Sequence, residues 1–353
     1  MRRGWTTGAC ATATARAAYT ALLSGAFPDP VEIALPKGQT PSFALAKHEL
    51  GQDTAAAGIV KDAGDDPDVS HGALVMVRVG RSPPGSGVTF VAGEGVGTVT
   101  REGLELAVGE PAINPVPRRM MEEAIADVAD RFGVVGDVEI EISIPGGEAM
   151  AEKTMNGRLG IVGGLSILGT TGIVIPFSCS SWIHSIHQGI DVARAAGIDH
   201  VAGSTGSTSE AAVAALYDLE EQALIDMGDF AGGMLKYLRD HPVARVTIAG
   251  GVAKIAKLAA GFLDLHSGRS QVDFDWLADL AADLDADPAL QARIRDANTA
   301  RQVMQICIEA QIPIADELAR RARDVAAGLL SDETEVEVLI FDRAGNLAGR
   351  AHG

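Results

Sequence analysis

A short acidic loop, from Lys61 to Gly72, carries the densest group of side chains that could do chemistry. Its sequence is Lys-Asp-Ala-Gly-Asp-Asp-Pro-Asp-Val-Ser-His-Gly, so four carboxylates, a lysine and a histidine fall within twelve residues. Such crowding can raise the pKa of a carboxyl proton acceptor or supply oxygen ligands for a hard cation. The spacing differs from that of an EF-hand loop. The alternative is a structural loop in which the aspartates bond to nearby backbone groups.

Two arginines, Arg118 and Arg119, follow a Pro-Val-Pro sequence at the expected start of a helix. Cations in the first turn oppose the helix dipole, at a cost of a few tenths to about 1 kcal/mol each. A bound anion would reverse this cost by using the free N–H groups and both guanidinium groups. The alternative is pairing one turn along the helix, Arg118 with Glu122 and Arg119 with Glu123.

Three turns in the second half of the chain follow predicted strands, at residues 203–209, 228–232 and 250–251. In a parallel sheet, ligands bind beyond the carboxyl ends of the strands. None of the three turns matches G-x-G-x-x-G or the phosphate-binding loop. Together, however, they predict a ligand crevice at one end of a sheet.

Six glycines lie between Gly157 and Gly172, separated by aliphatic rather than polar residues. The run follows an alternating, strand-like segment at residues 138–144. A glycine-rich backbone allows close approach to a ligand, positive φ angles or tight packing of chain segments. We expect the run either to line a ligand cleft or to pack two domains together.

The elements that must position these residues divide the chain into two domains. The first, residues 1–176, begins with an alanine-rich helix from Ala9 to about Leu23, capped by Thr6 or Thr7 and ended by Gly25. Strand-like runs and one further helix, over about 117–132, follow. Such an arrangement predicts an α+β domain with a mostly antiparallel sheet. The strand-like runs lie at residues 31–35, 42–45, 73–79, 87–91 and 138–144.

The second domain, residues 177–331, repeats strand, glycine-bearing turn and helix three times. This pattern predicts an α/β, Rossmann-like domain with a parallel sheet and crossover helices. Helices fill much of residues 276–329, and the run at 335–341 alternates partly like a strand. We expect residues 332–353 to return to the first domain.

Charge and composition limit the partners. The net charge of −18 argues against nucleic-acid or anionic-membrane partners, because both attract concentrated Lys and Arg. It does not exclude a small anionic substrate, which responds to local groups. No apolar run is long enough to cross a bilayer, and no secretory signal is evident. With three scattered cysteines, these features predict a cytoplasmic protein, which could form a homo-oligomer.

The histidines and cysteines form no metal motif. His184 and His187 share a predicted helix face but have no further ligands that we can place, which favours solvated or hydrogen-bonded histidines. We therefore predict no metal bound by the protein itself.

Several segments, taken together, resemble the cobalt-precorrin-5B (C-1)-methyltransferase family of oxygen-independent cobalamin biosynthesis. They occur in the family's order over nearly the whole chain. Two places depart from the family pattern, the turn at residues 203–208 and Ile175 before Pro176. The matching segments are residues 4–11 (Gly-Trp-Thr-Thr-Gly-Ala-Cys-Ala), 61–68 with 71–72, 93–100 (Gly-Glu-Gly-Val-Gly-Thr-Val-Thr), 109–119, 153–156, 158–174 and 248–261.

The resemblance implies methyl transfer from S-adenosylmethionine to C-1 of cobalt-precorrin-5B, giving cobalt-precorrin-6A, by a two-domain protein. The substrate is a cobalt corrinoid rimmed by carboxylates, and its cobalt arrives with it. The candidate substrate-binding residues are Thr6, Thr7, Arg118, Arg119, Arg158, Gly169, Thr170 and Thr171. The candidate residues for binding S-adenosylmethionine are Gly203, Thr205, Gly206, Gly250 and Gly251.

Methyl transfer from a sulfonium depends mainly on alignment, because the donor is already activated. A base among the candidate catalytic residues Asp65, Asp66 and His71 could help the macrocycle reach its nucleophilic form. Two alternatives stay open. One is a nucleotide-dependent tetrapyrrole oxidoreductase, which the parallel sheet would suit, although the glycine fingerprint and its acidic partner are missing. The other is a non-catalytic corrinoid-binding protein, against which the three glycine turns argue.

Overall fold

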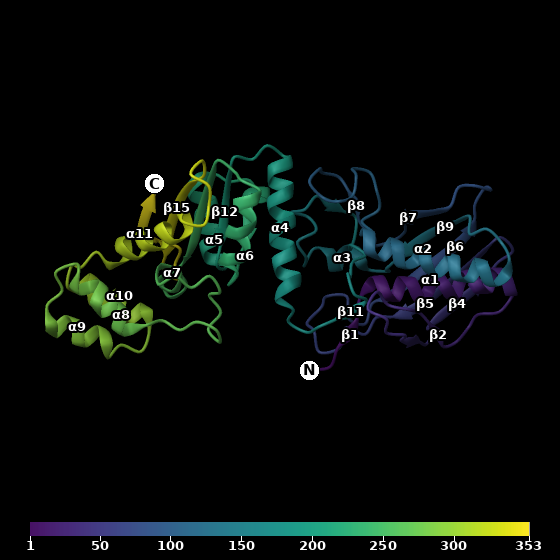
Figure 1. Ribbon diagram of the computed structural model, residues 1–353, viewed down its shortest axis with the longest axis horizontal. Helices are drawn as coiled ribbons and strands as arrows, with labels where there is room; N and C mark the ends of the chain where they lie inside the picture. The colour runs from purple at the N-terminus through teal and green to yellow at the C-terminus, as the bar shows by residue number, and fades with distance from the viewer. Residues whose placement is uncertain (353) are drawn as a thin grey trace. The chain divides into compact units, whose positions relative to one another are not determined.

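The computed structural model describes residues 1–352, which form two compact units (Figure 1). The first unit comprises Met1–Cys179, and the second begins at Ser180. The expected α+β and α/β architectures are both present. The first unit contains helices α1 (Thr7–Ser24), α2 (Pro115–Phe132) and α3 (Gly147–Ala151), and strands β1 (Gly4–Trp5), β2 (Val31–Glu32), β3 (Ser42–Phe43), β4 (Lys47–Leu50), β5 (Thr54–Val60), β6 (Leu74–Arg81), β7 (Val88–Ala92), β8 (Thr98–Val99), β9 (Val138–Ser143), β10 (Ile161–Val162) and β11 (Ile173–Val174).

The main sheet of the first unit has the order β4-β5-β6-β9-β7. All its pairs are antiparallel except β7 with β9, which confirms the predicted mostly antiparallel sheet. The sequence pattern does not indicate β5, Thr-Ala-Ala-Ala-Gly-Ile-Val, because alanine and glycine are depleted in strands. Its small residues instead leave room for α1, whose alanines are buried in the same core. Here packing overrides local propensity.

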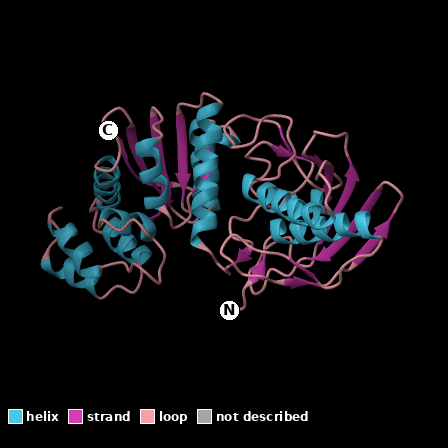
Figure 2. Ribbon diagram, turned by 45° about the vertical axis from the view of Figure 1, so that its right-hand side comes forward, coloured by secondary structure: helices cyan, strands magenta, loops and turns pink. Residues whose placement is uncertain are grey.

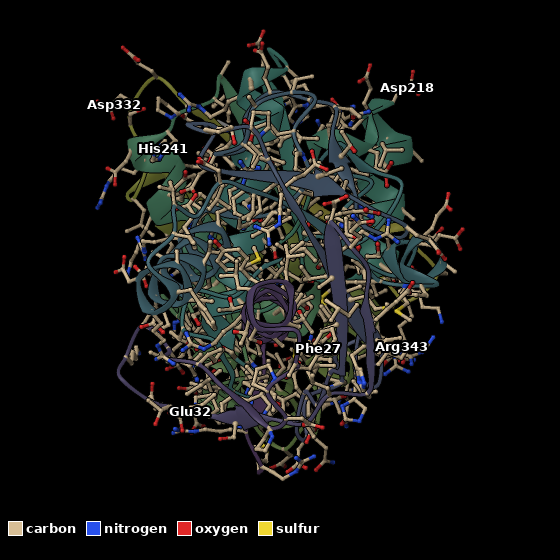
Figure 3. The ribbon with its side chains drawn as sticks, turned by 90° about the vertical axis from the view of Figure 1, so that its right-hand side faces the viewer. Phe27, Glu32, Asp218, His241, Asp332 and Arg343 are labelled. Carbon is tan, nitrogen blue, oxygen red and sulfur yellow. The ribbon has the colours of Figure 1, made fainter. Side chains whose placement is uncertain are left out.

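Helices α1 and α2 lie side by side along this sheet (Figure 2). Thr6 caps α1 by accepting a hydrogen bond from the Ala9 N–H at 3.1 Å, and Gly25 ends the helix in the left-handed region. The two helices run parallel, since Gly8 meets Pro117 near their starts and Arg16 pairs with Asp127 farther along. Their amino ends therefore lie together. Figure 3 views α1 end-on, with Phe27 labelled just beyond its last turn.

The second unit is built around one sheet with the order β13-β12-β14-β15-β16. The first four strands are parallel and only β16 is antiparallel, as expected for an α/β domain with crossover helices. The strands are β12 (His200–Ser204), β13 (Leu224–Asp226), β14 (Arg245–Gly251), β15 (Glu335–Phe341) and β16 (Leu347–His352). The helices are α4 (Cys179–Ala195, whose first residue falls in the first unit), α5 (Ser207–Tyr217), α6 (Ala231–Asp240), α7 (Val252–Ala259), α8 (Phe274–Ala282), α9 (Pro288–Arg295), α10 (Ala300–Glu309) and α11 (Ile314–Ala327), with a short 3-10 turn at Glu221–Ala223.

The helices of the second unit cover the two faces of this sheet unequally. Val213 of α5 packs with Ala202, Ala249 and Leu339 on one face. The other face is covered by several helices, because alternate strand residues pack against side chains of α4, α6, α7 and α11, among them Ile186, Met234, Ile255 and Leu318. Among the helices of residues 1–352, only α5 therefore packs on the face that carries Ser204 and Asp226.

The C-terminal residues correct one expectation. Residues 332–353 were expected in the first domain, but β15 pairs in parallel with β14 from Glu335 to Phe341, and β16 pairs with β15. Buried Val338 and Ile340 join the core of the second unit. The C-terminal strands thus complete the parallel sheet, and that expectation is wrong.

Candidate functional site

The acidic loop of the first unit forms a network of turns. Lys61 is buried, and its ammonium group bonds Asp68 and the Ser70 hydroxyl, the latter at 2.6 Å. Asp68 also accepts the Ser70 N–H at 2.8 Å, and Asp62 accepts the Gly64 N–H at 2.9 Å. These contacts confirm the structural alternative for Asp62 and Asp68.

The pKa values of Asp62 and Asp68 are both lowered. Burial raises the pKa of Asp68, but the Lys61 ammonium and its hydrogen bonds outweigh this effect and lower the pKa overall. The Arg2 guanidinium, by hydrogen bonding, lowers the pKa of Asp62 to about 2. The pKa of each of these two groups therefore moves in the direction opposite to the one that a crowded acidic loop suggests.

The three candidate catalytic residues lie at the edge of this network and bond to backbone groups. Asp65 accepts the Arg2 N–H, and Asp66 accepts the Phe177 N–H at 2.8 Å. His71 is about half exposed, and its Nδ1 accepts the Ala63 N–H at 3.1 Å. This bond assigns the neutral tautomer with hydrogen on Nε2, so the outward nitrogen is a donor. To accept a proton at Nε2, His71 would have to change tautomer and lose the Ala63 bond.

The amino ends of α1 and α2 meet the end of the glycine run. The Thr6 N–H donates to Gly172 O at 3.0 Å, the Gly8 N–H to Leu168 O at 3.1 Å, and the Asn114 N–H to Ile167 O at 3.0 Å. Thr6 and Thr7 are buried, whereas Thr170 is exposed and Thr171 is partly exposed. Thr6, Thr7, Gly169, Thr170 and Thr171 are therefore brought into one region. These helix ends offer few free N–H groups, because Leu168 O accepts the Gly8 N–H and the two prolines of α2 have no N–H.

The neighbouring arginines differ in their surroundings. Arg118 donates to Ile113 O at 2.7 Å, pairs with Glu110 at 2.7 Å, and lies over the Phe90 ring at 5.5 Å. The alternative pairing of Arg118 with Glu122 is therefore wrong, because Glu110 takes that place. Arg119 is 61% exposed and lies 3.9 Å from Glu123, so that ion pair is weak. Arg119, rather than Arg118, can reach an anionic ligand without breaking internal contacts.

The glycine run packs mainly against its own unit. A Cβ at Gly164 would lie 2.2 Å from the Gly95 backbone, and one at Gly169 would lie 2.4 Å from Thr6. At Gly157 and Gly163 no atom lies within 4 Å of such a Cβ. Close packing therefore explains part of the run, while Gly157, next to Arg158, is open.

In the second unit, most of the candidate cofactor residues gather at the carboxyl ends of β12 and β14. The connections from these adjacent strands leave in opposite directions, β12 toward β13 and β14 toward β15. Such a topological switch point is where open α/β sheets bind ligands. The Thr205 N–H donates to Ala249 O at 2.9 Å, and Gly206 and Gly251 begin α5 and α7 with no neighbour near an added Cβ.

Two of the four candidate glycines have a packing reason. A Cβ at Gly203 would lie 2.3 Å from the Met234 sulfur, and one at Gly250 would lie 2.8 Å from Thr205 Oγ1. Gly203 makes room for the core, so a ligand contact there is disfavoured. Gly250 brings the two strand ends close together.

Two further polar groups lie beside these turns: Lys254, which follows Gly250 and Gly251 in the sequence, and Asp226, which sequence reasoning missed. Lys254 donates to Thr205 O at 2.7 Å and lies 3.0 Å from Asp229. Asp226 ends β13, directly beside Ser204 of β12. Asp226 follows Gly206 by about twenty residues, which is the spacing of the acidic residue in dinucleotide-binding units. The expectation that this acidic partner is missing is therefore wrong, although the glycine fingerprint remains absent from these turns.

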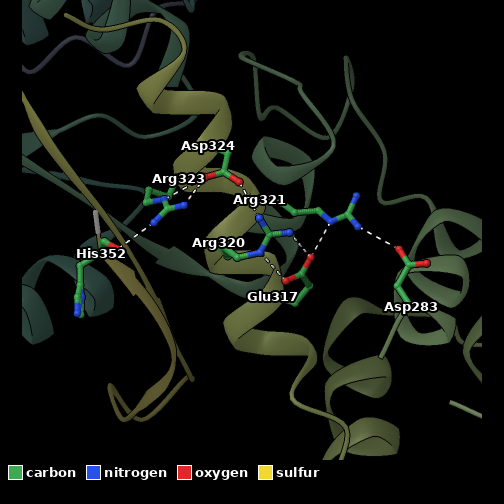
Figure 4. A network of polar contacts seen from close by, with 7 residues as sticks. All are labelled: Asp283, Glu317, Arg320, Arg321, Arg323, Asp324 and His352. Carbon is green, nitrogen blue, oxygen red and sulfur yellow. Dashed lines mark hydrogen bonds and ion pairs between the residues drawn. The ribbon is translucent and has the colours of Figure 1, made fainter. Parts of the chain in front are cut away.

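A groove of about 470 Å³ lies elsewhere in the second unit, beside α11, and none of the candidate residues lines it. Figure 4 shows its polar network, in which Arg320 and Arg321 bond to Glu317, and Arg323 bonds to Asp324. These guanidinium groups already have carboxylate partners. The groove therefore offers an anionic ligand little uncompensated positive charge.

The histidine pair has a structural explanation at one position. His187 stacks on Tyr237 with ring centroids 3.9 Å apart, and burial lowers its pKa. Among residues 1–352, no group of three or more His, Cys, Asp or Glu residues is placed to hold a metal ion. Nor does any helix within these residues have the length and apolar character needed to cross a membrane.

Comparisons with known proteins agree over both halves of the chain. The CbiD family model matches residues 1–176, and the model of the CbiD C-terminal domain matches residues 264–352. Two relatives carry the name cobalt-precorrin-5B C(1)-methyltransferase. The one from Paramagnetospirillum magneticum is 61% identical over 100% of this chain and 98% of its own, and the one from Bradyrhizobium sp. is 60% identical over 100% and 94%. A crystal structure of the cobalamin biosynthesis protein CbiD from Archaeoglobus fulgidus is 27% identical with a TM-score of 0.42, and covers 76% of this chain and 83% of that chain.

Proposed function

The chain belongs to the CbiD family of cobalt-precorrin-5B C(1)-methyltransferases, and we propose that it methylates C-1 of cobalt-precorrin-5B to give cobalt-precorrin-6A in corrin ring biosynthesis. The observation that carries this proposal is 61% identity over the entire chain to a relative of that name. We propose S-adenosylmethionine as the methyl donor, and a cytoplasmic location that suits the three free cysteines.

The donor supplies a methyl group on a sulfonium, which needs alignment more than activation. The carboxyl ends of β12 and β14 are the proposed site for it. Thr205, Gly206 and Gly251 offer backbone approach there, and Lys254 holds the Thr205 carbonyl in place. Gly250 contributes because its missing side chain lets the end of β14 lie close to Thr205, which follows β12.

The corrinoid carries carboxylates, so we assign its recognition to cationic and hydroxyl groups of the first unit. Arg119, Thr170 and Thr171 are the accessible members of the region where α1 and α2 begin. Arg158, beside open Gly157, is the second cation proposed for this role. Arg118, Thr6 and Thr7 have a structural role in this proposal. Arg118 bonds to Ile113 O, Thr6 caps α1, and Thr7 is buried.

A proton acceptor from the acidic loop remains part of the proposal. Asp65, Asp66 and His71 are its candidates, and each would first have to release a backbone N–H. Turnover by Asp65→Asn and His71→Ala variants that fold normally would remove these two residues from the mechanism.

The direct test of the function is incubation of the purified protein with cobalt-precorrin-5B and ¹³C-methyl-labelled S-adenosylmethionine. We expect one labelled methyl group on the product, located at C-1 by NMR. Reactions without enzyme or without donor are the controls. Absence of methylation with a folded enzyme contradicts the proposal.

Thermal unfolding separates the alternatives. We expect stabilisation by S-adenosylmethionine or S-adenosylhomocysteine and none by NADPH. Stabilisation by NADPH but not by the sulfur compounds would favour an oxidoreductase. Stabilisation by the corrinoid alone would favour a binding protein.

A further inference from the structure

The carboxyl end of β13 carries an acidic residue outside every predicted site. Asp226 is the last residue of this edge strand, and its register partner on β12 is Ser204. Ile225 is buried among the helices of the opposite face, so Asp226 shares with Ser204 the face covered by α5. The carboxylate therefore sits one strand away from the switch point.

Ser204 gives an independent indication of a ligand at this position. The residue is only 1% exposed, and its Oγ has no hydrogen-bond partner within residues 1–352. Buried hydroxyl groups in folded proteins normally have a hydrogen-bond partner, so an unpaired one indicates a missing water, ion or ligand. A polar ligand group at the carboxyl ends of β12 and β13 would supply the missing partner.

The surrounding backbone leaves room for such a ligand. Gly206, which follows Ser204 by two positions and begins α5, has no atom within 4 Å of an added Cβ. The backbone at Asp226 is held by the Trp182 indole N–H, which donates to Asp226 O at 2.9 Å. Asp226 also follows Gly206 by the spacing at which dinucleotide-binding units place the acidic residue that bonds ribose hydroxyls.

We propose that Asp226 accepts hydrogen bonds from the ribose hydroxyls of the nucleoside in the methyl donor, with Ser204 as the neighbouring polar contact. This inference rests on the proposed function and names the part of the donor that the second unit recognises. An ionised carboxylate accepts two hydrogen bonds at once, which matches the two adjacent donors of a ribose. The site should accordingly discriminate against 2′-deoxyribose.

The test is calorimetric binding of S-adenosylhomocysteine and its 2′-deoxy analogue to the full-length protein. We expect the unsubstituted protein to bind the ribose compound at least about tenfold more tightly than the deoxy compound, because one hydrogen bond to a charged group is lost. Asp226→Asn should weaken S-adenosylhomocysteine binding about tenfold and remove the preference. Asp218→Asn is the matched control, because Asp218 lies at the other end of α5 in the left-handed conformation that asparagine tolerates.

The outcomes separate this inference from the proposed function. Failure of the unsubstituted protein to bind S-adenosylhomocysteine overturns both. If the unsubstituted protein binds S-adenosylhomocysteine and the deoxy analogue equally tightly, the inference alone is overturned. It is also overturned if a folded Asp226→Asn variant keeps both its affinity for S-adenosylhomocysteine and its preference for the ribose compound. Loss of the preference in Asp226→Asn but not in Asp218→Asn supports it.

Discussion

Arg118 and Arg119 are adjacent in the chain but differ in what their guanidinium groups touch. Arg118 bonds Ile113 O and Glu110, whereas Arg119 is largely exposed. We predict that Arg119→Ala raises the KM for the corrinoid about tenfold with an unchanged unfolding free energy, because only a ligand contact is lost. Steady-state kinetics and urea unfolding would measure both effects.

Arg118→Ala should behave in the opposite way. Removing it takes the guanidinium donor from Ile113 O and Glu110, whereas Pro111 O keeps the Ile113 N–H, and we expect a loss of about 1–3 kcal/mol in unfolding free energy. Equal KM effects from the two variants, with no difference in stability, would contradict this division of roles.

Glu337 provides a pH prediction. It is fully buried and accepts hydrogen bonds from Tyr217, Thr247, Arg245 and Arg350. Burial raises its pKa, but these hydrogen bonds and the Arg245 charge outweigh burial and lower the pKa below the ordinary 4.5.

A lowered pKa in the folded state means that Glu337 stabilises the fold above about pH 4.5, and that this contribution is lost as the pH falls below that value. Glu337→Gln should cost about 1–3 kcal/mol at neutral pH, because the partly exposed Arg245 and Arg350 lose their buried carboxylate partner. Urea unfolding between pH 7 and pH 3 should show a shallower acid loss in the variant. An identical pH dependence would contradict the assignment.

The glycine run shows how one segment can serve packing at some positions and openness at others. Gly164 lies against the backbone of Gly95, whereas Gly157 has no neighbour near its missing Cβ and lies outside the left-handed region. We predict that Gly164→Ala lowers the unfolding free energy by about 1–3 kcal/mol. The new methyl group would meet the Gly95 backbone, which cannot move aside as a flexible side chain can. Gly157→Ala should leave the urea midpoint unchanged. A neutral Gly164→Ala would mean that the β8–β10 region moves freely.

The two units each have a hydrophobic core of their own, since the buried clusters draw on one unit or the other. We therefore predict that residues 180–353 fold alone and bind S-adenosylhomocysteine. At a ligand concentration of about 100 times Kd, binding should add about 2.7 kcal/mol to the unfolding free energy. Circular dichroism of the fragment during thermal unfolding, with and without ligand, measures this. A fragment that is unfolded at 25 °C, or one that is folded but not stabilised, contradicts it.

Features that depend on neighbours along the chain could be predicted from the sequence. The Thr6 cap, the Gly25 stop and the strand–turn–helix repeats of residues 200–259 are local, because capping and hydrophobic periodicity act within a few residues. The ordered motifs likewise identified the family, which the comparisons confirm.

Only the tertiary structure decided which distant segments meet. Strand β15 joins β14 rather than the first unit, and Asp226 of β13 lies beside Ser204 of β12. Each of these pairings depends on burial and register across the fold, which short-range patterns do not encode. The alanine-rich strand β5 shows the same effect, because its strand conformation follows from the helix packed against it and not from its own propensity.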